Sequence, residues 1–74
     1  MSLFDMSQMD FRTFIDFCRS RGLLTESDAL RVVAETAGGE YFRARQTMKY
    51  LMACGGPGSD LYKRAKEFLD GMPS

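Results

Sequence analysis

The chain has 74 residues with ten acidic and ten basic side chains, so its formal net charge is zero, and it contains no histidine. This length predicts one small domain. Without histidine, the chain lacks the most common general base near neutral pH and the most common metal ligand. Cys18 and Cys54 also lack the spacing of zinc ligands. We therefore expect no enzyme activity, no cofactor, no metal site and no small-molecule substrate.

Charged side chains near the start interrupt any apolar run that would resemble a signal peptide: Asp5, Asp10, Arg12 and Asp16. Nowhere does the sequence contain the ~18 consecutive apolar residues that a membrane span needs. Two cysteines are too few for the disulfide framework of a small secreted domain. These features predict a soluble, cytoplasmic protein with two free thiols and no membrane contact.

A lead-in segment over residues 1–8 is expected to precede a helical domain over residues 9–72. Four apolar residues have the i, i+3, i+4, i+7 spacing of one helical face: Phe11, Phe14, Ile15 and Cys18. They predict a first helix over about 9–21. Gly22 then supplies the residue in left-handed conformation that commonly ends a helix.

Thr25 is expected to cap a second helix, since its hydroxyl can accept from the free backbone N–H groups of the first turn. The inner face of this helix is predicted at four positions: Leu30, Val33, Ala34 and Ala37. Val32 is then expected to point outward. The pair Gly38-Gly39 allows a sharp change of direction and ends the helix.

The third helix is predicted over about 40–54, with its inner face at Tyr41, Ala44, Met48, Leu51 and Met52. At about 100° per residue, Phe42 and Tyr50 point away from that face. The segment Gly55–Gly58, with its proline, ends this helix.

Ser59 is the expected cap of a fourth helix over about 60–71. Its apolar side is predicted at Leu61, Ala65, Phe68 and Leu69. Asp60 and Arg64 have the i, i+4 spacing of an ion pair on the exposed side.

No stretch alternates with the period of a strand, so the sequence predicts an all-α fold: one small domain of about four short helices, arranged as a bundle or an orthogonal array. The mixed turn lengths favour the array.

Outward aromatic residues mixed with basic ones are typical of protein interfaces. We therefore predict a non-catalytic protein–protein interaction domain of the regulator, inhibitor or adaptor type. The expected partner-binding residues are Val32, Phe42, Arg43, Gln46, Lys49 and Tyr50. One expected partner is a second copy of the chain, with Arg43 and Lys49 facing acids such as Asp28 or Glu35 of the other copy.

The stretch from the second to the third helix also resembles a helix-turn-helix, with Ala34 and Gly38 at the positions of its small residue and turn glycine. This resemblance implies a DNA-binding regulator whose third helix offers Arg43, Gln46 and Lys49 to a major groove. Gly39 departs from it, since an apolar turn residue is usual there. Segments such as RGLLT (residues 21–25) and KEFL (residues 66–69) resemble a caspase-recruitment-type death-fold domain, which implies six helices.

Overall fold

The computed structural model describes residues 9–73, so the predicted lead-in segment over residues 1–8 lies outside the described residues. The described chain forms four helices and no strand: α1 (Phe11–Ser20), α2 (Glu26–Ala37), α3 (Tyr41–Gly55) and α4 (Asp60–Gly71). The all-α prediction is confirmed. The six helices implied by the death-fold resemblance are not found in this part of the chain.

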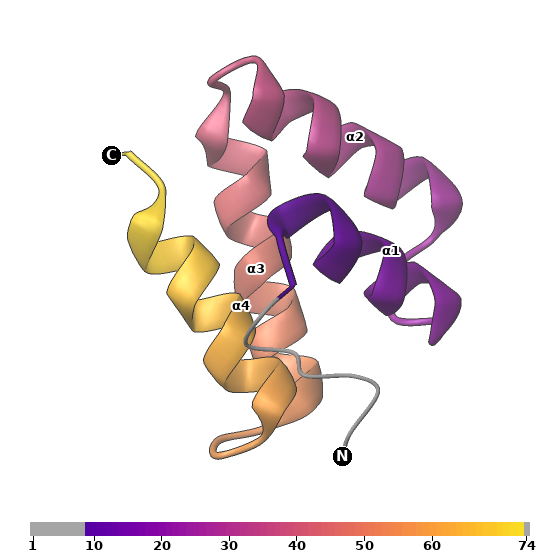
Figure 1. The fold of residues 1–74 in the computed structure, drawn as a ribbon, viewed down its shortest axis with the longest axis vertical. Coiled ribbons are helices and arrows are strands. Elements are labelled where there is room, and N and C mark those ends of the chain that lie inside the picture. The colour runs from indigo at the N-terminus through magenta and orange to yellow at the C-terminus, as the bar shows by residue number, and fades with distance from the viewer. Residues whose placement is uncertain (1–8, 74) are drawn as a thin grey trace.

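The helices are arranged as two pairs that cross each other (Figure 1). α1 and α2 run side by side in opposite directions, and α3 and α4 do the same along a steeply inclined direction. α2 also contacts α3, to which a short turn joins it. Of the two arrangements left open by the sequence, the described chain adopts the orthogonal array.

Side-chain caps set the starts of three helices. Thr25 Oγ1 accepts from the backbone N–H of Asp28 at 3.0 Å, and Ser59 Oγ accepts from that of Tyr62 at 3.0 Å, as predicted. α1 begins two residues later than expected, because Asp10 is its cap and accepts from the Thr13 N–H at 2.7 Å. Hydrogen bonds from the side chain and from the backbone N–H of Thr13 lower the pKa of Asp10.

The core lies where the two helix pairs cross. Its buried side chains come from all four helices and from the segments before α1 and α2: Met9, Phe14, Ile15, Cys18, Leu24, Ala29, Val32, Ala44, Met48, Leu51 and Ala65. The predicted inner faces of α1 and α3 are confirmed, because Phe14, Ile15, Met48 and Leu51 are fully buried.

α2 is rotated relative to the prediction by about one residue. Val32, expected to point outward, is 1% exposed, whereas Leu30, expected in the core, is 67% exposed. The structure uses the stripe Ala29, Val32, Val33 and Thr36, which has the same helical spacing. Thr36 is the polar residue of this stripe. It can be partly buried because its hydroxyl has a hydrogen-bond partner, the Val32 carbonyl, to which it donates at 2.8 Å.

The other predicted inner residues of α2 follow the same correction: Ala34 and Ala37 are exposed, and Val33 is half-buried. Val32 is therefore removed from the predicted binding residues.

Two glycines with positive φ set the directions of α2 and α3. Gly22 (φ +77°) lets the N–H of Leu23 bond the carbonyl of Cys18 at 2.9 Å, which closes α1 as predicted. Gly39 (φ +81°) lets the N–H of Glu40 bond the carbonyl of Glu35 at 2.8 Å, which closes α2. These turns bring the segment before α2 alongside α3.

Candidate functional site

One side of α3 is exposed along the length of the helix. We call it the α3 face and define it by Phe42, Arg43, Gln46, Lys49, Tyr50, Ala53 and Cys54. Phe42 is 69% exposed and Tyr50 is 56% exposed, although both side chains are large and partly or wholly apolar. The opposite side of the helix holds Ala44, Met48 and Leu51, which are fully buried, so the core fixes the direction in which the face points. Five of the six predicted binding residues lie on it.

A groove of about 400 Å³ runs beside the α3 face. Its α3 wall consists of Arg43, Gln46, Thr47 and Tyr50. Its other wall is the turn between α1 and α2 together with the first turn of α2: Gly22, Leu23, Leu24, Thr25 and Asp28. Three of the predicted binding residues thus line one concave site, and Phe42 and Lys49 lie outside it on the same face.

Tyr50 lines this groove together with one acid, Asp28, and one base, Arg43. A hydrogen bond with the Cys54 side chain is the largest cause of the raised pKa of Tyr50, and the charge of Asp28 acts in the same direction. The Tyr50 hydroxyl therefore lies within electrostatic reach of Asp28. Asp28 also lies 3.8 Å from Arg31, an exposed pair that contributes little to stability.

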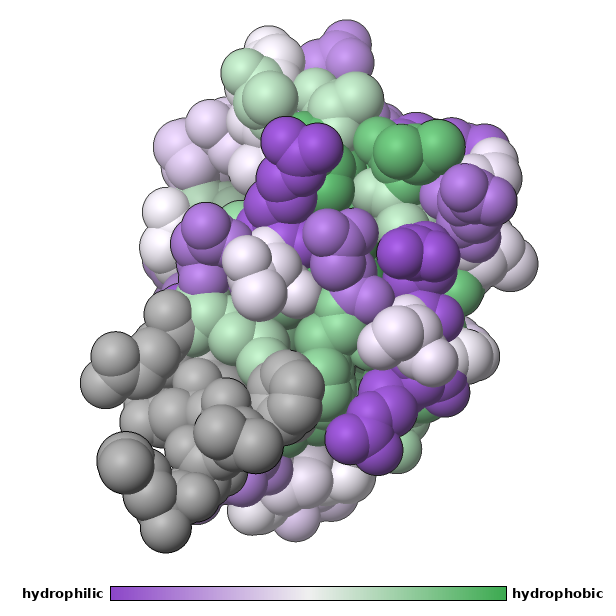
Figure 2. Space-filling view, turned by 45° about the vertical axis from the view of Figure 1, so that its right-hand side comes forward, coloured by the Kyte–Doolittle hydropathy of each residue, from purple (hydrophilic) through white to green (hydrophobic). Residues whose placement is uncertain are grey.

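Leu30 is another large exposed apolar side chain, and the sequence did not predict its exposure. It lies off the α3 face, in a smaller groove of about 150 Å³ between α1 and α2 that is lined by Arg12, Asp16, Arg19, Glu26, Ala29, Leu30 and Val33. On the side of the molecule in Figure 2, apolar areas alternate with strongly hydrophilic ones. Leu30 has four charged residues and the apolar Ala29 and Val33 beside it in this groove, and Ala34 follows it one helical turn later as an exposed small side chain. A single large apolar side chain in such surroundings is ordinary on protein surfaces.

A third concave region, of about 290 Å³, lies between the start of α1 and the end of α4 and is lined in part by Phe11, Tyr41, Phe68 and Met72. Of these wall residues, Phe11, Phe68 and Met72 pack against the core. Sequence reasoning missed both this region and the groove, because each is formed by segments that are distant in the sequence.

The two cysteines are free thiols in different environments. Cys18 is buried and Cys54 is exposed at the end of the α3 face. Burial raises the pKa of Cys18 to about 11, and the nearby Cys54 adds to the shift. In the described part of the chain, no three His, Cys, Asp or Glu side chains gather as they would around a metal ion.

None of the helices within residues 9–73 has both the length and the apolar composition that crossing a membrane requires. Comparisons with protein-family models, with curated proteins and with solved structures give no match for this chain.

Proposed function

We propose that this domain is a non-catalytic protein–protein interaction module of the regulator, inhibitor or adaptor type, which binds its partner through the α3 face and the adjoining groove. The observation that carries the proposal is the position of Phe42 and Tyr50, two exposed aromatic side chains on one helix face beside a concave site. Exposed apolar surface of this kind on a small domain is typical of a binding site.

The energetics favour a protein partner. Removing an aromatic side chain from water contributes about 1.5–3 kcal/mol, so Phe42 and Tyr50 together offer a large part of the free energy of a micromolar complex. Arg43, at the edge of the groove, adds a planar group with five donors. Tyrosine and arginine are enriched among the residues that dominate interface energies.

A helix-turn-helix DNA-binding regulator is the second candidate. It is favoured by the exposure of Arg43, Gln46 and Lys49 on a helix that follows a short turn. Two acids in the first turn of α2, Glu26 and Asp28, count against it, because Asp28 lines the same groove as Arg43 and repels phosphate. A DNA complex would weaken steeply with salt, whereas a complex that depends on aromatic burial would not.

A photo-reactive side chain at the centre of the face tests the proposal. We would replace Gln46 with p-benzoylphenylalanine in the native host, irradiate, and identify what is attached. Leu30 is the matched control, since it is also exposed but lies off the α3 face. We expect a discrete protein adduct from position 46 that is absent from position 30. An adduct with nucleic acid would support the second candidate, and equal labelling from both positions would refute a site on α3.

A further inference from the structure

The exposed side chains of α3 have the same order of residue types in both directions from Gln46. Three positions away on each side is a basic residue, Arg43 before it and Lys49 after it. Four positions away on each side is an aromatic residue, Phe42 before it and Tyr50 after it. All five side chains are exposed on the α3 face. A surface with this order presents the same chemistry to a partner helix that runs in the opposite direction.

We propose that the partner of the α3 face is a second copy of this chain, with the two α3 helices antiparallel about a two-fold axis at the level of Gln46. This inference rests on the proposed function, and it names the partner. A two-fold interface is self-complementary, so each contact occurs twice. With a rise of about 1.5 Å per residue, Phe42 and Tyr50 lie about 6 Å on either side of Gln46. Phe42 of one copy therefore reaches the level of Tyr50 of the other.

Charge complementarity supports this occupant. Arg43 lines the groove together with Asp28 and Tyr50, whereas Lys49 does not line it. The two-fold axis is perpendicular to the plane that contains the two helices. It therefore places the groove side of one α3 alongside the groove side of the other, with the helix directions reversed. Arg43 of one copy then lies at the level of Tyr50 of the other, next to Asp28 of that copy.

Lys49 is placed on the opposite flank, beside Phe42, by the 100° spacing of helical residues. The same rotation brings Lys49 of one copy to the level of Phe42 of the other, where its charge can lie over the ring. Like charges are thus not opposed directly at either position. Asp28 and Glu35 are the two acids predicted to meet these bases. Asp28 is exposed and Glu35 is half-buried, so Asp28 is the better placed of the two to contact a second copy.

The size of the domain sets the expected strength. A standard interface buries about 800 Å² on each partner, roughly a sixth of the 4950 Å² of accessible surface of this chain. One helix face with the adjoining turn buries an area at the low end of what stable interfaces bury. We therefore expect a reversible dimer with a dissociation constant in the micromolar range.

The decisive experiment reverses the charge at Asp28 in one variant and at Arg43 in another, and tests the two variants separately and mixed. Sedimentation velocity from about 1 to 500 µM would be run on the wild type, on Asp28→Arg, on Arg43→Asp and on an equimolar mixture of the two variants. Each single variant places two like charges together in its own dimer, so we expect dissociation to be at least about tenfold easier. In the mixture, Arg43 of the first variant meets Asp28 of the second, and the introduced arginine meets the introduced aspartate. A heterodimer is therefore expected.

Two controls keep the result interpretable. Leu30→Ala removes an exposed apolar side chain off the face and should leave the dimer unchanged. Lys63→Asp carries the same charge change as Arg43→Asp but places the acid on α4, so alone it should dimerise like the wild type, and mixing it with Asp28→Arg should yield no more dimer than the two variants form separately. Recovery in the first mixture also excludes misfolding as the cause of the single-variant losses.

Two results would overturn the inference in different ways. A wild-type monomer at every concentration refutes self-pairing, and the proposed function then stands if position 46 still cross-links to a different protein. A wild-type dimer that neither charge reversal weakens places the self-interface elsewhere, which removes both the inference and its argument for the α3 face.

Discussion

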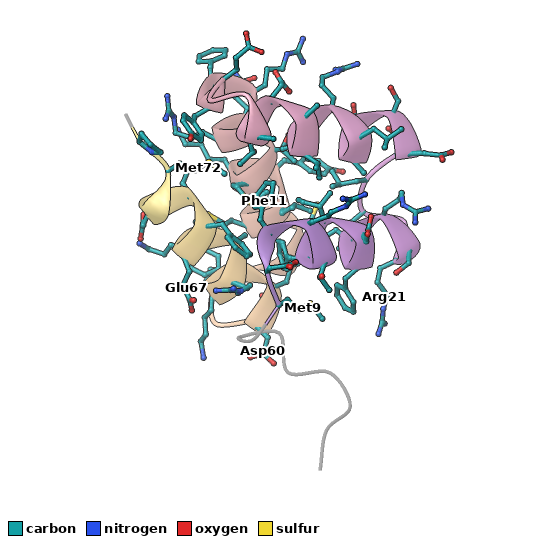
Figure 3. All side chains as sticks on the ribbon, turned by 45° about the horizontal axis from the view of Figure 1, so that its top comes forward. Met9, Phe11, Arg21, Asp60, Glu67 and Met72 are labelled. Atoms are coloured by element: carbon teal, nitrogen blue, oxygen red, sulfur yellow. The ribbon has the colours of Figure 1, made fainter. Side chains whose placement is uncertain are left out.

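The guanidinium carbon of Arg64 lies 4.0 Å from the centre of the Phe68 ring. The same ring is 5.2 Å from that of Phe11, in an edge-on arrangement, and 5.4 Å from that of Phe14. Arg64 also donates to the backbone carbonyl of Met9. Figure 3 shows the start of α1, marked by Met9 and Phe11, beside α4. This cluster joins the first helix to the last.

Replacing Arg64 with alanine is expected to destabilise the domain by about 1–3 kcal/mol. The substitution removes a partly buried cation–π contact and leaves the Met9 carbonyl without its donor. The Arg64 side chain is only 16% exposed, so solvent replaces these contacts poorly. Urea unfolding followed by circular dichroism measures the change. Lys63→Ala, on the exposed neighbour, should stay within about 0.5 kcal/mol. Equal effects at the two positions would contradict a specific role for Arg64.

The register of α2 can be tested with two matched substitutions. Val32→Ala is expected to cost about 1–3 kcal/mol, because Val32 is 1% exposed and its loss leaves a cavity in the core. Leu30→Ala removes a larger side chain but should cost less than about 0.5 kcal/mol, because Leu30 is 67% exposed. The two free energies of unfolding are compared by urea titration. The opposite order would support the face predicted from the sequence.

Val32 and Leu30 also show which buried helix faces the sequence could predict and which it could not. The inner faces of α1 and α3 were predictable because each offers one strong apolar stripe, containing Phe14 and Ile15 in α1 and Met48 and Leu51 in α3. α2 offers two overlapping stripes, and hydropathy alone selects the one with leucine. The stripe that is used contains Thr36, whose hydroxyl is satisfied within its own helix.

Helical periodicity predicted the exposed residues of the site, but it could not predict the shape of the groove. The outward direction of Phe42 and Tyr50 follows from helical periodicity. The groove depends on how the turn before α2 lies against α3, and that is a tertiary relationship. Arg64 was expected to pair with Asp60 on the exposed side, but it lies over Phe68 and pairs with Glu67 at 2.8 Å.

Gly55 and Gly71 give a second matched pair. A Cβ at Gly55 would lie 2.7 Å from Ser59 Oγ and 3.0 Å from Leu61 Cβ, so the cap of α4 would have to shift. Gly55→Ala is therefore expected to lower stability by about 1–2 kcal/mol. A Cβ at Gly71 meets nothing within 4 Å, and alanine there should be neutral or stabilising by up to about 1 kcal/mol. Thermal unfolding of both variants checks the prediction, and a stabilised Gly55→Ala would contradict it.

Thiol labelling provides a readout of the α3 face. Cys54 is exposed and its side chain hydrogen-bonds with Tyr50, whereas Cys18 is buried. Iodoacetamide at pH 8 should therefore modify Cys54 in the native protein and modify Cys18 only after unfolding. If the face pairs with a second copy, labelling of Cys54 should slow as the concentration rises through the dimerisation range. Mass spectrometry measures both rates. Rapid labelling of Cys18 in the native protein would contradict its burial in the core.

Stability should fall at alkaline pH because of Cys18. Burial raises the pKa of its thiol from 9.0 to about 11, so the folded state keeps a proton that the unfolded state releases. The resulting stabilisation is fully present below pH 9 and is lost as pH rises through 11. The Cys18→Ala variant lacks this contribution. It keeps those of Tyr50 and of Lys66, whose pKa is raised by its hydrogen bond with Asp70. The difference in unfolding free energy between the wild type and this variant should therefore shrink by about 2 kcal/mol between pH 8 and 11. A difference that stays constant over that range would show that Cys18 ionises normally in the folded protein.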